Sequence, residues 1–166
     1  ARRLQLPAAA RPAALASFRR VLVQDSTTIK LTPKLAAAFP GSRNQRGANH
    51  GQLKIQALYD LLAQRFVTFS LSGFNRNDQA AAGDVLRVVQ AGDLGLRDLG
   101  YFVVASLQQI AQAGAFFLSR LRLDPGLLDP RTGQSLNLLG QLKRHGQFDG
   151  EVLLGASSFN PKHPAG

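Results

Sequence analysis

The chain has 166 residues, of which 45% are hydrophobic, so it suits a single globular domain with a buried core and not a disordered segment. It has no cysteine, which excludes disulfides, thiolate zinc sites and thiol nucleophiles, and no apolar run approaching the ~20 residues of a membrane span. The formal net charge of +10 favours a polyanionic partner, most commonly nucleic acid, with a ribosomal-type or genome-wide composition bias as the alternative.

The N-terminal part predicts a helical lead-in followed by a buried strand. Pro12 is tolerated in a first helical turn, which indicates a short helix over residues 11–19. Residues 20–25 are apolar on both faces, as expected for a central strand, and the run ends in the carboxylate of Asp25.

The next stretch predicts a loop and then an antiparallel hairpin. A short helix over residues 33–39 is followed by residues 41–51, which are Gly-rich, polar and basic and predict a loop. Residues 53–58 and 66–71 alternate between apolar and polar side chains, and the short connection around Asp60 is typical of a hairpin.

The remainder of the chain alternates between helix and strand. Asn77-Asp78 predicts the cap of a helix that runs through the apolar positions of residues 81–89. The segments that follow are a strand, a helix and a strand over residues 94–97, 106–113 and 116–123. Three antiparallel strands followed by this alternation indicate a mixed α/β sheet. Residues 124–166 differ in character, with a helix over 136–144 and a strand over 151–154, and predict a second, incomplete segment.

Two aspartates at the ends of strands are the candidate catalytic and metal-binding residues. Asp25 ends the first strand and Asp98 follows the fourth. Burying an unpaired carboxylate costs free energy, so a carboxylate that is kept at the end of a buried strand usually serves chemistry. Two such carboxylates on neighbouring strands suit Mg²⁺, which points to phosphoryl transfer on nucleic acid. The alternatives are an Asx-type turn at Asp25, with bonds from the backbone of Thr27 or Thr28, and competition from Asp93 as the nearby acid.

Arginines and one lysine predict a basic approach to this site. Arg43, Arg46 and Lys54 are expected to contact DNA phosphates, with a solvated loop as the alternative. Other arginines that would extend the basic patch are Arg19, Arg20, Arg120 and Arg122. The three histidines show no ligand spacing and predict no zinc site.

Three segments together resemble a known family. They are Val23-Gln-Asp25-Ser-Thr27, Leu53-Lys-Ile-Gln-Ala-Leu-Tyr-Asp60 and Arg97-Asp98-Leu-Gly-Tyr-Phe102, and the two aspartates are 73 positions apart. Their order and spacing resemble the DDE transposases of bacterial insertion sequences, in the insertion-sequence-four group.

The resemblance implies a ribonuclease-H-like fold in which the first and fourth strands are neighbours. It further implies that Asp25, Asp98 and a third acidic residue hold two Mg²⁺ or Mn²⁺ ions, which activate a water or 3′-hydroxyl and stabilise the leaving oxygen. The implied reaction nicks the transposon end and joins it to target DNA. The implied partners are DNA and a second copy of the intact protein, in the bacterial cytoplasm at the nucleoid.

The third acidic residue departs from the family pattern. The family's glutamate has a tyrosine and an arginine upstream and a lysine downstream, and the one candidate here is Glu151. Its neighbours at the corresponding positions are Arg144, Gln147 and Ser158, and none matches. We therefore expect a fragment with a lead-in over residues 1–19, a transposase core over 20–123 and an incomplete insertion over 124–166, without strand-transfer activity. The alternative is a basic nucleic-acid-binding module without catalysis.

Overall fold

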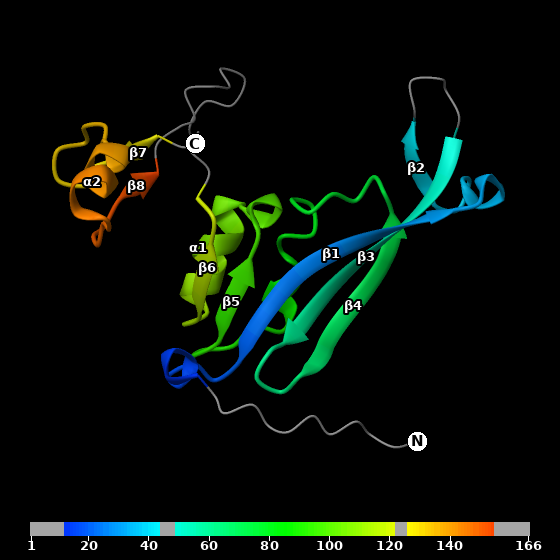
Figure 1. Cartoon of the computed structure of the whole chain (residues 1–166), viewed down its shortest axis with the longest axis horizontal. Coiled ribbons are helices and arrows are strands. Elements are labelled where there is room, and N and C mark those ends of the chain that lie inside the picture. Colours follow the sequence, from blue (N-terminus) through cyan, green and yellow to red (C-terminus); the bar gives the residue numbers. More distant parts are fainter. Residues whose placement is uncertain (1–11, 44–48, 122–125, 155–166) are drawn as a thin grey trace. The chain divides into compact units, whose positions relative to one another are not determined.

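The structure is a computed structural model, and it describes residues 12–43, 49–121 and 126–154. The chain divides into two compact units, residues 1–120 and residues 121–166, and each is described by itself. The first unit is a mixed α/β structure built on one curled sheet, and the second contains a small helix and a two-stranded sheet (Figure 1).

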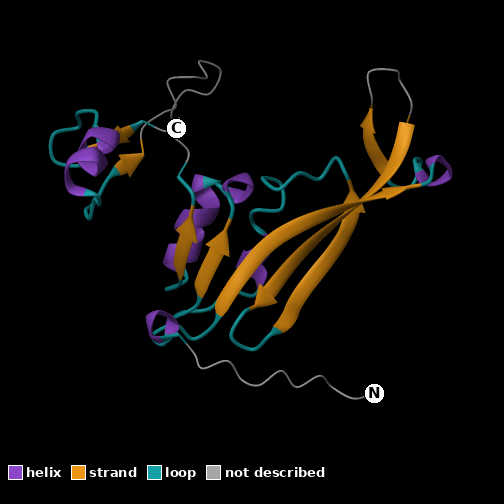
Figure 2. Ribbon diagram, in the orientation of Figure 1, coloured by secondary structure: helices purple, strands orange, loops and turns teal. Residues whose placement is uncertain are grey.

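The sheet of the first unit combines an antiparallel half with a parallel half (Figure 2). Its strands follow the order β2-β3-β1-β5-β6, and β4 also pairs with β3. Strands β1, β3 and β4 are antiparallel neighbours, whereas β1, β5 and β6 are parallel. The strands are β1 (Val21–Leu31), β2 (Pro40–Arg43), β3 (Asn49–Asp60), β4 (Arg65–Gly73), β5 (Leu94–Arg97) and β6 (Phe116–Ser119).

Strand β1 is longer than the sequence predicted. The expected end at Asp25 is wrong, because the strand continues to Leu31 and pairs with β3 from Leu22–Asp60 to Leu31–Gly51. Thr27, Thr28 and Ile29 are β-branched and suit this extension, which keeps Asp25 inside the antiparallel ladder. The predicted loop over residues 41–51 is also partly wrong, since β2 and the start of β3 lie within it; residues 44–48 fall outside the described residues.

Three of the predicted helices are shorter and tighter than expected. The lead-in and the segment after β1 form single 3₁₀ turns, η1 (Ala13–Leu15) and η2 (Pro33–Leu35). The helix predicted from Asn77 is a series of turns that ends in the 3₁₀ helix η3 (Asp84–Arg87). Gly83 and the β-branched valines around it lower the helix propensity of this segment. The predicted helix over 106–113 is present as α1 (Val104–Gln112).

The core lies on the side of the sheet covered by η3 and α1. Its buried cluster joins β1, β3, η3, α1 and the residue before β6, through Leu22, Leu58, Val85, Leu107, Ile110 and Ala115. Side chains alternate across a strand, so Gln24 and Ser26 share the face of Leu22. The neighbouring residue Asp25 points to the opposite face.

Much of that opposite face is apolar and exposed. Asp25 pairs with Ala57 and Ala57 with Phe69, so these side chains share one face of β1, β3 and β4. Phe69 is 65% exposed. Other large apolar side chains that stay exposed on the same face are Ile29, Phe66, Leu71, Phe116 and Leu118.

The second unit contains β7 (Leu127–Leu128) and β8 (Leu153–Leu154), which pair antiparallel, and α2 (Leu138–His145). The side chain of Asn137 caps α2 by accepting from the backbone N–H of Gly140, and Gly146 ends the helix with a positive φ of 74°. Glu151 is exposed and precedes β8. No helix in the described part of the chain is long and apolar enough to span a membrane.

Candidate functional site

The two candidate aspartates follow the last aligned pair of two neighbouring parallel strands. The β1–β5 ladder runs from Val21–Leu94 to Gln24–Arg97. The next residues are Asp25, within β1, and Asp98, directly after the end of β5, so residues 73 positions apart in sequence come to the same edge of the parallel half-sheet. Both line one open groove of about 590 Å³, whose other lining residues are Val23, Gln24, Leu96, Arg97, Leu118, Ser119 and Arg120.

The carboxylate of Asp25 is exposed, and its one described hydrogen bond is local. Oδ1 accepts from the backbone N–H of Ser26 at 2.8 Å. The alternative of an Asx-type turn with Thr27 or Thr28 does not hold, because the residue lies within a regular ladder paired to Ala57. The carboxylate therefore retains free lone pairs toward the groove.

The carboxylate of Asp98 is also exposed and is weakly paired. The residue is the N-cap of η4 (Leu99–Tyr101), but its side chain makes no capping bond. Arg120 Nη1 lies 3.5 Å from Asp98 Oδ1, and the two side chains are 75% and 63% exposed. An ion pair of this length and exposure contributes little stability, so the Asp98 carboxylate remains available to bind a metal ion.

The donor set of the groove fits a hard divalent cation in part. Two exposed carboxylates on neighbouring strands supply oxygen ligands of the type Mg²⁺ and Mn²⁺ prefer. Within residues 12–43, 49–121 and 126–154, no group of three or more His, Cys, Asp or Glu side chains gathers at one point. The groove therefore offers two carboxylate ligands from this part of the chain.

Of the three basic residues predicted to contact DNA, Lys54 is the one whose side chain the structure describes. Arg46 lies outside the described residues, and the side chain of Arg43 in β2 is not described. Lys54 is buried, and its Nζ lies 2.8 Å from Asp78 Oδ1. In this structure the Lys54 ammonium is the partner of an internal carboxylate and not an exposed cation.

Asp93, the competing acid, has a structural role. Its side chain is fully buried and accepts from Arg20 Nε at 3.1 Å and from Arg20 Nη2 at 2.5 Å, and from the backbone of Gln90 at 2.9 Å. Burial alone would raise the pKa of Asp93, but these bonds hold it below its ordinary value. Arg19 Nη1 also approaches at 3.8 Å. Arg19 and Arg20 thus neutralise Asp93 at the start of β5.

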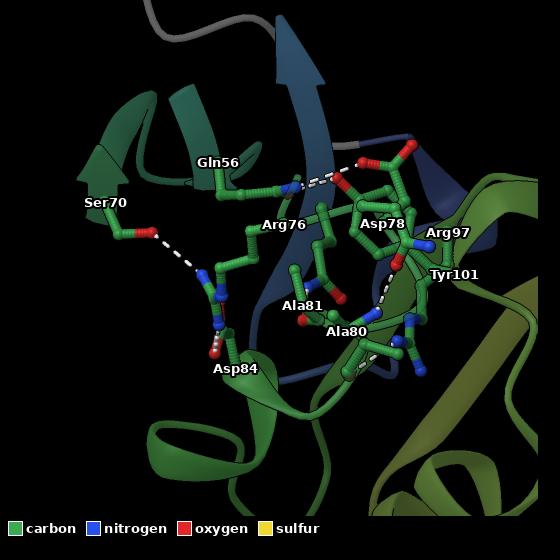
Figure 3. A network of polar contacts seen from close by, with 12 residues as sticks. Gln56, Ser70, Arg76, Asp78, Ala80, Ala81, Asp84, Arg97 and Tyr101 are labelled. Atoms are coloured by element: carbon green, nitrogen blue, oxygen red, sulfur yellow. Dashed lines mark hydrogen bonds and ion pairs between the residues drawn. The ribbon is translucent and has the colours of Figure 1, made fainter. Parts of the chain in front are cut away.

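A polar network behind the sheet was missed by sequence reasoning (Figure 3). Its centre is Asp78, whose Oδ1 accepts from Ser26 Oγ at 2.8 Å and Gln56 Nε2 at 3.1 Å, besides Lys54. Burial alone would raise the pKa of Asp78, but these donors hold it below its ordinary value. The Tyr101 hydroxyl donates to Gln56 Oε1, and burial raises the pKa of Tyr101.

Asn77 does cap the turn that follows it, since its Oδ1 accepts from the Ala80 backbone N–H at 2.9 Å. The sequence analysis assigned Asp78 to the same cap and therefore did not predict its role in the polar network. The available signal was the polar face of the β3 strand, where Lys54 and Gln56 alternate with apolar residues and need buried partners.

Comparison with known proteins shows the family to which the chain is similar. Residues 16–153 match the family model described as transposase DDE domain. The transposase for insertion sequence element IS231B of Bacillus thuringiensis subsp. berliner is 33% identical over 135 residues, which cover 81% of this chain and 28% of the relative.

Two further relatives also match most of this chain over a small part of their own length. The transposase for IS231D of Bacillus thuringiensis subsp. finitimus is 36% identical over 107 residues, covering 64% of this chain and 22% of the relative. The transposase for IS1151 of Clostridium perfringens is 26% identical over 131 residues, covering 79% and 27%. The chain therefore spans between 22% and 28% of the length of these relatives.

Proposed function

The chain belongs to the transposase DDE domain family of insertion sequences, and we propose that it is part of the catalytic core of a DNA transposase with a ribonuclease-H-like fold. The observation that carries the proposal is the register of β1 and β5, whose last aligned pair is Gln24–Arg97. This register supports Asp25 and Asp98 as two members of the acidic set.

We assign the two carboxylates the role of metal ligands. When bound, the divalent ions of such a site activate the attacking oxygen and stabilise the leaving oxygen of the phosphodiester. Asp25 offers the lone pairs that Ser26 does not use, and Asp98 offers a carboxylate whose one ion pair within residues 12–43, 49–121 and 126–154 is the long contact with Arg120. The polynucleotide is the substrate that the net charge of +10 favours.

We propose that the 166 residues alone do not transfer strands. Glu151, the candidate third acid, lies in the second unit and lacks the family's flanking residues. Two carboxylates hold a divalent ion less tightly than three, because each ligand lost removes a charge and a coordination bond. We further propose that the intact protein acts on transposon ends and target DNA in the cytoplasm, as a homodimer.

The experiment that tests this function is Mn²⁺ binding by calorimetry and by paramagnetic broadening of backbone amides. The wild-type chain is compared with Asp25→Ala, Asp98→Ala and the control Asp149→Ala, which removes an exposed carboxylate of the second unit. We expect weak binding that both groove variants abolish and the control retains. Binding that is absent, or unchanged in the groove variants, contradicts the proposal.

The second candidate is a basic module that binds nucleic acid without catalysis, and the net charge of +10 favours it. It predicts DNA affinity that falls steeply with salt and does not depend on divalent ions. A salt titration of DNA binding, with and without Mn²⁺, distinguishes the two candidates: the transposase proposal requires that Asp25→Ala alter the metal-dependent part of the binding.

A further inference from the structure

Side chains beside both groove carboxylates bind one short segment on the opposite side of the sheet. This segment comprises residues 77–83, lies between β4 and η3, and is called the 77–83 turn. On β1, the two residues that flank Asp25 both reach it: Gln24 Nε2 donates to the Ala81 carbonyl at 2.8 Å, and Ser26 Oγ donates to Asp78 Oδ1 at 2.8 Å.

The same turn contacts the residues around Asp98. Arg97, which precedes it on β5, donates from Nη2 to the Ala82 carbonyl at 2.6 Å. Gly100, two residues after it in η4, lies against the Asp78 side chain. A Cβ atom at position 100 would come within 3.0 Å of Asp78 Oδ2. Asp78 therefore touches the element that carries Asp98 as well as the one that carries Asp25.

Strand β3 holds the turn from a third direction. Lys54 and Gln56 both bind Asp78 Oδ1, and the Tyr101 hydroxyl of η4 donates to Gln56 (Figure 3). The Asp78 carboxylate is ionised at neutral pH, because its hydrogen-bond donors hold its pKa below the ordinary value for an aspartate. Hydrogen bonds to an ionised acceptor are stronger than those between neutral groups, which makes this a firm tether.

We propose that Asp78 is a positioning residue, which sets the separation of Asp25 and Asp98 from behind the sheet. The β1–β5 ladder ends at Gln24–Arg97, so the ladder itself stops one residue short of both carboxylates. Beyond the last pair of the ladder, Asp78 contacts Ser26, the residue after Asp25 on β1, and also contacts Gly100 of η4. This role rests on the proposed function of the two carboxylates as metal ligands.

The test uses Asp78→Asn with Asp84→Asn as its matched control. Asp84 also lies on this side of the sheet and is in an ion pair, with Arg76 Nη2 at 2.7 Å, and its side chain is 23% exposed against 31% for Asp78. The Asp84 pair touches neither β1 nor η4 by any described hydrogen bond. Both substitutions remove one carboxylate charge from an internal ion pair.

A geometric measurement is available because the chain has no cysteine. With Asp25→Cys and Asp98→Cys combined, the equilibrium between dithiol and disulfide in a glutathione buffer reports how often the two side chains meet. We expect Asp78→Asn to lower the effective concentration of this pair severalfold and Asp84→Asn to leave it unchanged. Ser26→Ala removes only the β1 tether and replaces Asp78→Asn if that variant does not fold.

The second measurement is Mn²⁺ affinity with the native carboxylates. Loss of a residue that orients a metal ligand weakens binding by about 10- to 100-fold, and we expect this for Asp78→Asn but not for Asp84→Asn. If the wild-type chain binds no Mn²⁺ while the disulfide equilibrium still depends on Asp78, the positioning role stands and the metal site of the proposed function fails. Equal disulfide equilibria in the Asp78, Ser26 and Asp84 variants overturn the positioning role.

Discussion

Gln24 and Arg97 face each other across β1 and β5, and their side chains donate to the carbonyls of two consecutive residues, Ala81 and Ala82. Arg97 is buried, and its guanidinium carbon lies 5.8 Å from the centre of the Tyr101 ring. Among the described residues, Nε and Nη1 of Arg97 have no hydrogen-bond partner. Burial accordingly lowers the pKa of Arg97. The core thus contains a costly cation directly before Asp98.

Replacing this cation by an apolar side chain of similar length should not weaken the fold. For Arg97→Met we expect a free energy of unfolding within about 1 kcal/mol of the wild type, or above it, because exchanging a buried ion for a hydrophobe removes its desolvation cost. The lost bond to Ala82 and the ring contact offset part of that gain. Urea denaturation measures the difference, and a loss above about 3 kcal/mol would show that the guanidinium is a net stabiliser.

The pair of Arg20 and Asp93 should behave in the opposite way. Arg20→Met leaves the fully buried Asp93 carboxylate without its main partner, and we expect a loss of about 3–5 kcal/mol in the free energy of unfolding. Arg19→Met is the matched control. Arg19 is about half exposed and 3.8 Å from Asp93, so its replacement should cost less than about 1 kcal/mol. Equal losses of stability in the two variants would contradict Arg20 as the main partner of Asp93.

Acid should destabilise the protein through its two internal aspartates. The folded-state pKa values of Asp78 and Asp93 are below the ordinary value, so protons bind more readily to the unfolded chain. This stability is complete above the unfolded pKa of about 3.9 and is lost as the pH falls through the lower folded values. Urea denaturation between pH 3 and 6 should show the decline, and Asp93→Asn should flatten it. Stability that rises on acidification would contradict this sign.

The two faces of the sheet should respond differently to truncation. Ile110→Ala opens a cavity in the buried cluster and should cost about 2–5 kcal/mol. Phe69→Ala removes a ring that is already 65% exposed, and it should cost far less while lowering the binding of a hydrophobic dye. Parallel denaturation and dye titrations make the comparison. A Phe69 variant as destabilised as the Ile110 variant would place that ring in the core.

Local sequence patterns were sufficient for several elements. Strand β5 at Leu94–Arg97 has the predicted bounds, and the hairpin of β3 and β4 forms around Asp60, whose Oδ1 accepts from the backbone of Leu62 and Ala63. These elements depend on alternation and turn chemistry, which lie within a few neighbouring residues. Helix α1 lies within two residues of its prediction for the same reason.

Other features depend on distant residues, which no local pattern shows. Lys54 is basic and lies on the polar side of its strand, but that side meets Asp78 and is buried. The segment after Asn77 has helical spacing, yet the carbonyls of Ala81 and Ala82 accept from side chains of β1 and β5 and the segment forms turns. A sequence pattern reports which face of an element is polar and does not report what covers that face.

The sequence by itself determined that two carboxylates follow apolar strand positions and that the chain is strongly basic. It also determined the resemblance to the DDE family, because that resemblance depends on residue identities and their order. Only the tertiary structure decided that Asp25 and Asp98 share a groove, because the chain must first return over 73 sequence positions to pair β5 beside β1. Only the tertiary structure decided that Asp78 contacts β1, β3 and η4 together, since these contacts join segments that no local pattern brings into proximity.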